Sequence, residues 1–312
     1  MHTVARLSFA RAGALGARLG ALAWRLSPSR ADVAARQLEA RLGCPPPRAR
    51  ELGRAVFEHL GRASLEALAA MRLPPERRIE LCSNYAECRE RIREDLARGS
   101  GLLVVTAHLG SWELLGSICS TIAPAHVVAE RPHAPALADW LEAARGRLGM
   151  RTLYTDVFPR ELIRALARNE LVGILADHDL HRARGLFAPF LGREAWTPTA
   201  PVVIAQRTGC VLRPVFLVRE GEGERYRFVL HDAIRVPPRS AGAAGIREAT
   251  LCWVQAIERE IRARPEQWTW MHPRWRTRPP GEALRPGERS PLGAPAERSA
   301  AAEVEALGRA AS

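Results

Sequence analysis

The sequence predicts an α/β protein in which a mostly parallel, mixed sheet is flanked by helices and follows a helical N-terminal section. Three observations support this fold class. Short apolar runs, beginning with Leu102–Val105, alternate with helical stretches through the middle of the chain, as they do around a parallel sheet. Residues 1–98 carry only helical patterns. The last two apolar runs look antiparallel, which favours a mixed sheet edge.

The first element is an apolar stretch over residues 3–26 in which Arg11, Arg18 and Arg25 recur every seven residues. This spacing places the arginines on one helical stripe. Their charges argue against a secretory signal and against a transmembrane helix. The pattern is typical of an interfacial helix that lies in the plane of lipid headgroups. The alternative is an amphipathic helix packed on the protein's own core.

The remaining elements follow from apolar periodicity and from Pro and Gly punctuation. Helices are predicted at 30–43, 47–71, 86–97, 112–122, 135–148, 159–168, 198–206 and 246–263. Strands are predicted at 102–105, 126–129, 152–154, 172–175, 211–217 and 226–230, and a long loop at 177–197. We therefore expect a membrane-associating helical section at 1–98, an α/β core at 99–278 and a disordered tail at 279–312.

Composition narrows the classes of partner. The chain has 312 residues, a formal net charge of +12 and six cysteines, and all 46 of its basic residues are arginine. Such an excess of positive charge favours attraction to anionic lipids, phosphorylated sugars, acidic proteins or nucleic acid. The cysteines form no CxxC pair, so they indicate reduced thiols in a protein that faces the cytosol.

The stretch from Leu102 to Gly116 carries the chemistry. His108 ends a predicted strand just before a helix for which Ser111 is a candidate N-cap, and open α/β sheets place their sites there. His108 and Glu113 would lie roughly 140° apart on one helix, so they meet only if His108 precedes it. A carboxylate on one imidazole nitrogen makes the other a general base. The alternative is a structural histidine at a strand end.

These residues resemble a known family. His108-x-x-x-x-Glu113, written HLGSWE, resembles the Hxxxx(D/E) motif of glycerolipid-type acyltransferases, and above all that of the late acyltransferases of lipid A biosynthesis, the lauroyl and myristoyl transferases. Three further stretches match in order, at 173–179, at 187–192 with 197–199, and at 265–279. The resemblance spans roughly residues 1–280 and implies a glycerolipid-acyltransferase-like fold.

The resemblance implies an O-acyltransferase. The donor would be an acyl thioester, on acyl carrier protein or CoA, and the acceptor a hydroxyl of a lipid A precursor in the membrane. The protein would sit on the cytosolic face of the bacterial inner membrane, as a peripheral or monotopic protein. No cofactor, metal or nucleic acid is expected. Phosphatidylinositol mannoside acyltransferases share the motifs, so another glycolipid or an aminolipid acceptor is an alternative. A non-catalytic, basic membrane-binding protein is a second one.

Within this hypothesis His108 is the general base and Glu113 orients it. Backbone N–H groups near Ser111 would bind the oxyanion. No Ser or Cys stands in a recognisable nucleophile context, so a covalent acyl-enzyme is not expected.

Substrate-binding side chains are expected at Arg131, Arg145 and Arg184, because cations suit phosphates and acidic headgroups, and at Asp177 from the resemblance. For each arginine, an ordinary solvated side chain is the alternative. Arg145 with Gly149 resembles the family's RxxxG spacing, and Asp177 would be a wall of the site. Asp177 begins a cluster of Asp and His that looks like metal ligands, but neighbouring side chains on a strand point to opposite faces. We therefore expect no metal there. The resemblance favours a wall of the site, and structural hydrogen bonding within a loop is the alternative.

Overall fold

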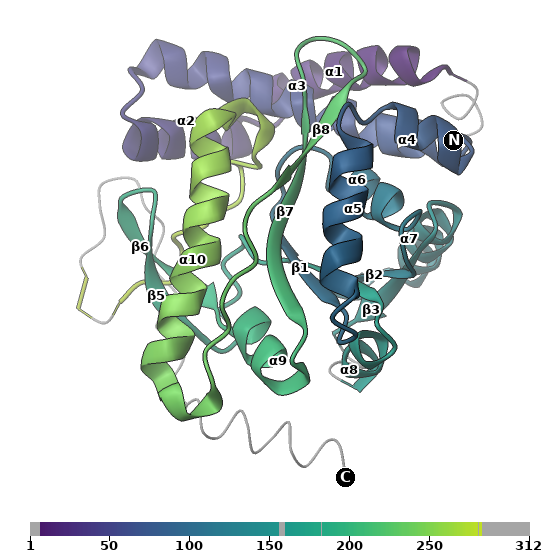
Figure 1. Ribbon diagram of the computed structural model, residues 1–312. Helices are drawn as coiled ribbons and strands as arrows, with labels where there is room; N and C mark the ends of the chain where they lie inside the picture. The colour runs from purple at the N-terminus through teal and green to yellow at the C-terminus, as the bar shows by residue number, and fades with distance from the viewer. Residues whose placement is uncertain (1–6, 156–159, 182, 280, 283–312) are drawn as a thin grey trace.

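The computed structural model describes residues 7–155, 160–181, 183–279 and 281–282, and Figure 1 shows their arrangement. One six-stranded sheet in the order β3-β2-β4-β1-β7-β8 forms the centre. Its strands are β1 Leu102–Thr106, β2 Ala125–Ala129, β3 Met150–Tyr154, β4 Leu171–Leu175, β7 Val211–Arg219 and β8 Tyr226–Leu230. All pair in parallel except β8, which runs antiparallel to β7 at one edge. The predicted fold class and the mixed edge are confirmed.

The helices follow the predicted order with small shifts at their ends. They are α1 Phe9–Leu26, α2 Pro28–Leu42, α3 Pro46–Ala70, α4 Pro75–Glu80, α5 Tyr85–Leu96, α6 Trp112–Cys119, α7 Pro135–Arg147, α8 Arg160–Ala167, α9 Ala200–Thr208 and α10 Gly242–Ala263. The short α4 was not predicted, because six residues with one proline give too few turns for a periodic signal.

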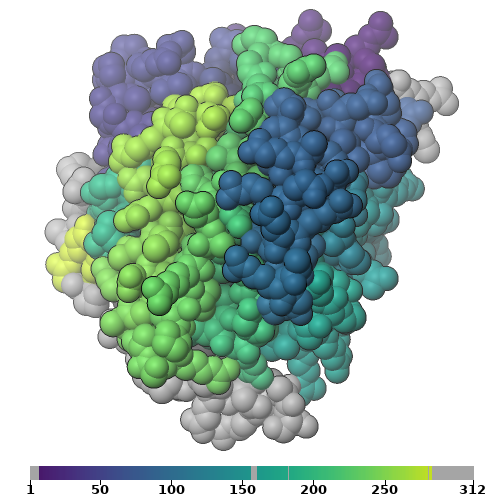
Figure 2. Space-filling view, in the orientation of Figure 1, coloured from purple at the N-terminus to yellow at the C-terminus, as the bar shows by residue number. Residues whose placement is uncertain are grey.

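The sheet separates two apolar cores. Leu103 and Val105 of β1 face a core with residues of α8, α9 and α10, whereas Leu102 and Val104 face a core with residues of α5 and α6. This alternation follows from the two-residue period of a strand. Figure 1 looks toward the β7–β8 edge, with α10 on the left and α5 on the right. In the space-filling view the side chains of these two helices dominate the near face (Figure 2).

The N-terminal helices lie together at the end of the sheet where β7 turns into β8 (Figure 1). α1 packs directly on α3: a Cβ on Gly16 would overlap the carbonyl of Gly61, and a Cβ on Gly20 would overlap that of Phe57. The two backbones therefore touch without side chains between them. Within the described residues, no helix is long and apolar enough to span a bilayer.

The other face of α1 remains exposed. Leu19, Leu22 and Leu26 are 47%, 48% and 72% exposed. The predicted arginine stripe lies beside them and is also exposed. One face of α1 thus packs on the protein, and the other leaves leucines and arginines exposed; its placement in a membrane interface stays a prediction. The expected disordered tail lies almost entirely outside the described residues.

The predicted loop at 177–197 is wrong in its second half. Residues Gly185–Phe190 form β5 and Arg193–Pro198 form β6, an antiparallel hairpin apart from the main sheet. Its two-residue turn has positive φ at both Leu191 and Gly192, as a type I′ hairpin turn requires. A leucine in that conformation is uncommon, so the sequence pattern gave little sign of the turn.

Candidate active site

The central feature of the site is a histidine joined to a buried aspartate. β1 and β4 are neighbours, with Thr106 in register with Leu175. His108 and Asp177 each follow two residues later, so the ladder brings them out side by side. His108 Nδ1 lies 2.9 Å from Asp177 Oδ1, and the His108 backbone N–H donates to Asp177 Oδ2 at 3.0 Å. The Asp177 side chain is fully buried, whereas that of His108 is 25% exposed.

Asp177 is held as a carboxylate. Trp268 Nε1 also donates to Asp177 Oδ2, at 2.8 Å. Burial by itself would raise the pKa of Asp177, but the adjacent His108 and the hydrogen bonds from His108 and Trp268 outweigh burial and keep that pKa below its ordinary value. An ionised aspartate on Nδ1 keeps the proton on that nitrogen and leaves Nε2 as the basic atom. This arrangement fits a general base.

The structure corrects three roles predicted from the sequence. Glu113 does not take the Nδ1 side of His108, because Asp177 occupies it. Glu113 pairs instead with Arg145, whose Nη2 donates to Oε1 at 2.7 Å and whose Nε lies 3.2 Å from Oε2. Arg145 was expected to bind substrate, yet its guanidinium is engaged by Glu113. Asp177, expected in the substrate wall, has both oxygens occupied and no exposed side-chain surface.

The oxyanion role predicted for Ser111 is also wrong for its own N–H. The Ser111 N–H donates to the carbonyl of Leu217, and the Gly110 N–H donates to that of Gln267. Both N–H groups are therefore already hydrogen-bonded within the protein. The Ser111 side chain does not cap α6. The first N–H groups of that helix, from Trp112 onward, therefore remain as the donors that point out of the helix start.

The other two expected substrate residues lie in different surroundings. The Arg131 guanidinium sits 3.9 Å from the ring centroid of Tyr154, in a cation–π contact. Arg184 immediately precedes β5 of the hairpin, and its backbone carbonyl accepts the Thr199 N–H. Arg184 Nη1 is buried without a hydrogen-bond partner among the described residues. The structure does not bring these two arginines into hydrogen-bonding contact with His108 or Asp177.

Three imidazoles form a stack that the sequence did not predict. The His108 ring lies face to face with that of His178, with centroids 3.8 Å apart and an interplanar angle of 6°. His272 stacks on the far side of His178 at 3.8 Å and 8°. The edge of Trp112 meets His108 at 5.2 Å. His178 and His272 lie in matched motifs far apart in the chain, so their spacing carried no signal of contact.

The side chains that could ligate a metal ion at this site are those of His108, Asp177 and His178. Possible ligand atoms of His108, Asp177 and His178 lie within 4.8 Å of one another. However, both oxygens of Asp177 already accept hydrogen bonds. The lone pairs of two stacked imidazoles lie in parallel planes and do not converge on one point. These residues therefore fit a base and its orienting carboxylate better than a coordination shell.

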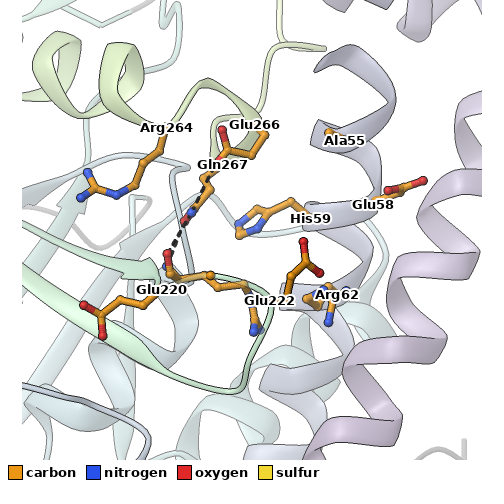
Figure 3. Close-up of a pocket in the computed structure, with 11 residues that line it drawn as sticks. Ala55, Glu58, His59, Arg62, Glu220, Glu222, Arg264, Glu266 and Gln267 are labelled. Carbon is orange, nitrogen blue, oxygen red and sulfur yellow. Dashed lines mark hydrogen bonds between the residues drawn. The ribbon is translucent and has the colours of Figure 1, made fainter. Parts of the chain in front are cut away.

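A cavity of about 590 Å³ lies between α3, the β7–β8 turn and residues 264–267. Figure 3 shows the residues that line it. His59 projects into it from α3 (Figure 3), and its Nε2 lies 3.1 Å from the carbonyl oxygen of Gly110, to which a protonated Nε2 donates. Burial lowers the pKa of His59 to about 4, so this ring is neutral at pH 7. His59 thus ties α3 to the loop that carries His108.

An open, mostly parallel sheet with a carboxylate-held histidine at its carboxyl edge is the arrangement expected of an α/β enzyme, and it would suit general-base catalysis. The comparisons give the family. Residues 1–277 match the family model described as bacterial lipid A biosynthesis acyltransferase. The chain belongs to this family and is an acyltransferase.

Its relatives include three named transferases. The lipid A biosynthesis lauroyltransferase of Escherichia coli (strain K12) is 29% identical over 273 residues, 86% of each chain. The lipid A biosynthesis palmitoleoyltransferase of the same organism is 28% identical over 274 residues, again 86% of each chain. The phosphatidylinositol mannoside acyltransferase of Mycolicibacterium smegmatis (strain ATCC 700084 / mc(2)155) is 25% identical over 185 residues, 58% of each chain.

Proposed function

We propose that this acyltransferase moves a fatty acyl chain from an acyl thioester, carried by acyl carrier protein, to a hydroxyl of a lipid A precursor, with His108 as the general base. The observation that carries the proposal is the His108 Nδ1 to Asp177 Oδ1 contact of 2.9 Å. It supplies the tautomer and the negative charge that a base at Nε2 requires.

The proposed step is direct transfer. The acceptor hydroxyl gives its proton to His108 Nε2 as its oxygen attacks the thioester carbonyl. The C–S bond then breaks, and the imidazolium returns the proton to the leaving thiolate. An ester and a free thiol result, and His108 is neutral again. Asp177 stabilises the imidazolium in between.

The developing oxyanion needs donors aimed at it. The N–H groups of Trp112 and Glu113, in the first turn of α6, are our candidates, since those of Gly110 and Ser111 are bonded within the fold. Both belong to the helix start that follows His108 by four residues. Arg145 pairs with Glu113 at this same helix end, where a carboxylate is favoured by the helix dipole.

The acceptor rests on the relatives' names, two of which specify lipid A biosynthesis. The phosphatidylinositol mannoside acyltransferase relative keeps a second glycolipid acceptor as an alternative for the same chemistry. Acyl-CoA is the alternative donor.

We also propose that α1 attaches the protein to the cytosolic face of the inner membrane, as a peripheral or monotopic protein. Leu19, Leu22 and Leu26 would enter the acyl boundary. Arg11, Arg18 and Arg25 would meet anionic headgroups, at about 1 kcal/mol for each basic residue near the surface. A soluble donor and a bilayer-resident acceptor meet only at that interface.

The test of the activity uses purified protein with a lipid A precursor and acyl carrier protein thioester, with acyl-CoA and a phosphatidylinositol mannoside in parallel. Mass spectrometry should detect a lipid A precursor that has gained one acyl chain. His108→Ala should lower the rate at least about 100-fold. His133→Ala, which removes an exposed histidine, is the matched control. A near-normal rate in His108→Ala, or a stoichiometric acyl-enzyme with donor alone, would contradict the mechanism.

A further inference from the structure

We propose that His178 is a positioning residue for the general base: its ring face fixes the plane in which His108 presents Nε2 and supports the imidazolium that forms during transfer. The inference rests on the proposed function of His108. It assigns a role to a side chain that lies outside both the acid–base pair and the substrate contacts proposed above.

His178 lies flat against the ring of His108. The His108 and His178 rings are nearly parallel, with an angle of 6° and centroids 3.8 Å apart, so the contact is made face to face. Asp177 fixes His108 by two hydrogen bonds at one edge of the residue. A hydrogen bond at Nδ1 still allows the ring to tilt about the Cβ–Cγ bond. A flat neighbour against the ring face removes that freedom.

His178 is held in place from its far side by His272. His272 stacks on its far face at 3.8 Å, and His272 Nε2 accepts the Asp179 backbone N–H at 3.0 Å. The Asp179 carboxylate in turn accepts the Thr277 N–H at 2.6 Å and the Thr277 hydroxyl at 2.8 Å. The outer ring is therefore anchored by two separate segments of the chain. His178 is clamped between a fixed ring and the base.

His178 contacts His108 through the face of its ring and not through its ring nitrogens. Its side chain makes no hydrogen bond within the described part of the chain, and its Nε2 is buried without a partner. Imidazole N–H bonds lie in the ring plane, so parallel stacked rings cannot pass a proton directly between them. A proton relay through the stack is excluded on this geometry.

Charge supports the same role. Burial, with a contribution from the neighbouring His108, lowers the pKa of His178 to about 4, although Asp177 opposes the shift. Burial and the neighbouring His178 lower the pKa of His272 to about 3. Both outer rings are neutral at pH 7. The imidazolium of His108 would therefore lie between the Asp177 carboxylate and a neutral aromatic face, which attracts a cation.

The experiment compares His178→Ala with His178→Phe, which restores an aromatic face, and with His181→Ala, a neighbouring histidine outside the stack. We measure kcat and KM for donor and acceptor. His178→Ala should lower kcat by about 10- to 100-fold and leave both KM values within about threefold, since no substrate contact is removed. His178→Phe should recover most of the loss, and His181→Ala should match the unchanged protein.

A spectroscopic measurement tests the stack without activity. In protein labelled with ¹³C-histidine, the ring signals of His108, assigned by their absence in His108→Ala, should shift in His178→Ala and return toward their original positions in His178→Phe. Thermal melting identifies any variant that fails to fold, and the comparison is then made on His178→Phe and His178→Leu.

The outcomes separate the two hypotheses. If His108→Ala keeps its rate, the proposed function fails and the inference falls with it. If His108→Ala is inactive while His178→Ala has an unchanged kcat, only the positioning role is overturned. It is equally overturned if folded His178→Phe has the same kcat as His178→Ala, or the same kcat as His178→Leu where His178→Ala fails to fold.

Discussion

His108 and Asp177 are joined twice, once through the ring and once through the backbone. Asp177 Oδ1 meets His108 Nδ1 at 2.9 Å, and Oδ2 accepts the His108 N–H at 3.0 Å. The same Oδ2 accepts Trp268 Nε1–H at 2.8 Å. Asp177 Oδ2 therefore accepts from two N–H donors, so any side chain that replaces Asp177 must place an acceptor atom at that position.

Asp177→Asn should inactivate the enzyme without unfolding it. The asparagine must turn its carbonyl oxygen toward the two N–H donors on the Oδ2 side, so its NH₂ group faces His108 Nδ1. That nitrogen must then accept, and the proton moves to Nε2, where the base is lost. We expect kcat to fall by about 100- to 10,000-fold in the acyl transfer assay. Asp232→Asn, an exposed aspartate, should be neutral. Equal activity in the two variants would remove Asp177 from the mechanism.

Glu113 and Arg145 should behave as one unit. Their side chains are 25% and 16% exposed and are held in a two-point contact, so removing either partner disturbs the other. Glu113→Gln and Arg145→Gln should each lower kcat/KM. The kcat/KM of the double variant should be close to that of the less active single variant. Additive losses in this double-mutant cycle would show that the two side chains act separately.

The exposed leucines of α1 should govern membrane binding. Leu22→Glu with Leu26→Glu places carboxylates where the leucines would enter the bilayer, and we expect binding to anionic lipid vesicles to fall at least about 10-fold. Leu137→Glu on α7 is a matched control, because Leu137 and Leu22 are both 48% exposed. These substitutions are cleaner than deleting residues 1–26, because deletion would also uncover α3. Co-sedimentation with vesicles provides the measurement, and unchanged binding of the double variant would place the attachment elsewhere.

The contact between α1 and α3 should tolerate no side chain. Gly16→Ala sets a methyl group against the Gly61 carbonyl, and overpacking of this kind costs about 1–3 kcal/mol. Gly146→Ala in α7 meets nothing within 4 Å, so it should stabilise the protein by about 0.5–1 kcal/mol through helix propensity. Denaturant unfolding of both variants measures the difference. Similar midpoints would mean that α1 moves away without cost.

Stability should fall as the pH drops from neutral toward 4. Burial lowers the pKa values of His59 and His178 to about 4 and that of His272 to about 3. The unfolded chain therefore binds more protons below pH 6.5, and by pH 4 each ring lowers the free energy of unfolding by on the order of 3 kcal/mol. Protonation of Asp177 adds to the loss only near and below pH 4, because its folded pKa is depressed. His178→Phe should show a shallower decline in melting temperature between pH 6.5 and 4, and an unchanged slope would contradict the neutral stack.

Much of the fold could be predicted, because apolar runs and helical periods mark each element locally. β1 and α6 fall where the pattern around His108 placed them. The partner of His108 could not be predicted in this way. Asp177 lies 69 residues further along the chain, and only the strand order, with β4 rather than β2 beside β1, makes them neighbours. Glu113 was the nearer carboxylate in sequence, but its helix α6 faces Arg145 of α7.

The imidazole stack and the hairpin were missed for related reasons. His178 and His272 meet through the packing of segments 94 residues apart, which leaves no periodic trace. The β5–β6 turn depends on Leu191, whose φ is 48°. A leucine gives no indication in the sequence that it adopts this conformation. Arg145 was expected to bind substrate and Ser111 to bind the oxyanion, but the Arg145 guanidinium pairs with Glu113 and the Ser111 N–H donates to the Leu217 carbonyl. Predicting these contacts requires knowledge of the tertiary structure.

The register between β1 and β4 has one more consequence. His108 and Asp177 each lie two residues beyond the paired residues Thr106 and Leu175, so the distance between them is set by the central sheet and should not change while its middle strands stay paired. Amide hydrogen exchange of Thr106 and Ala176 should therefore be among the slowest in the molecule, and the site should open only at the free energy of global unfolding. Activity and native structure should then disappear in a single step on heating.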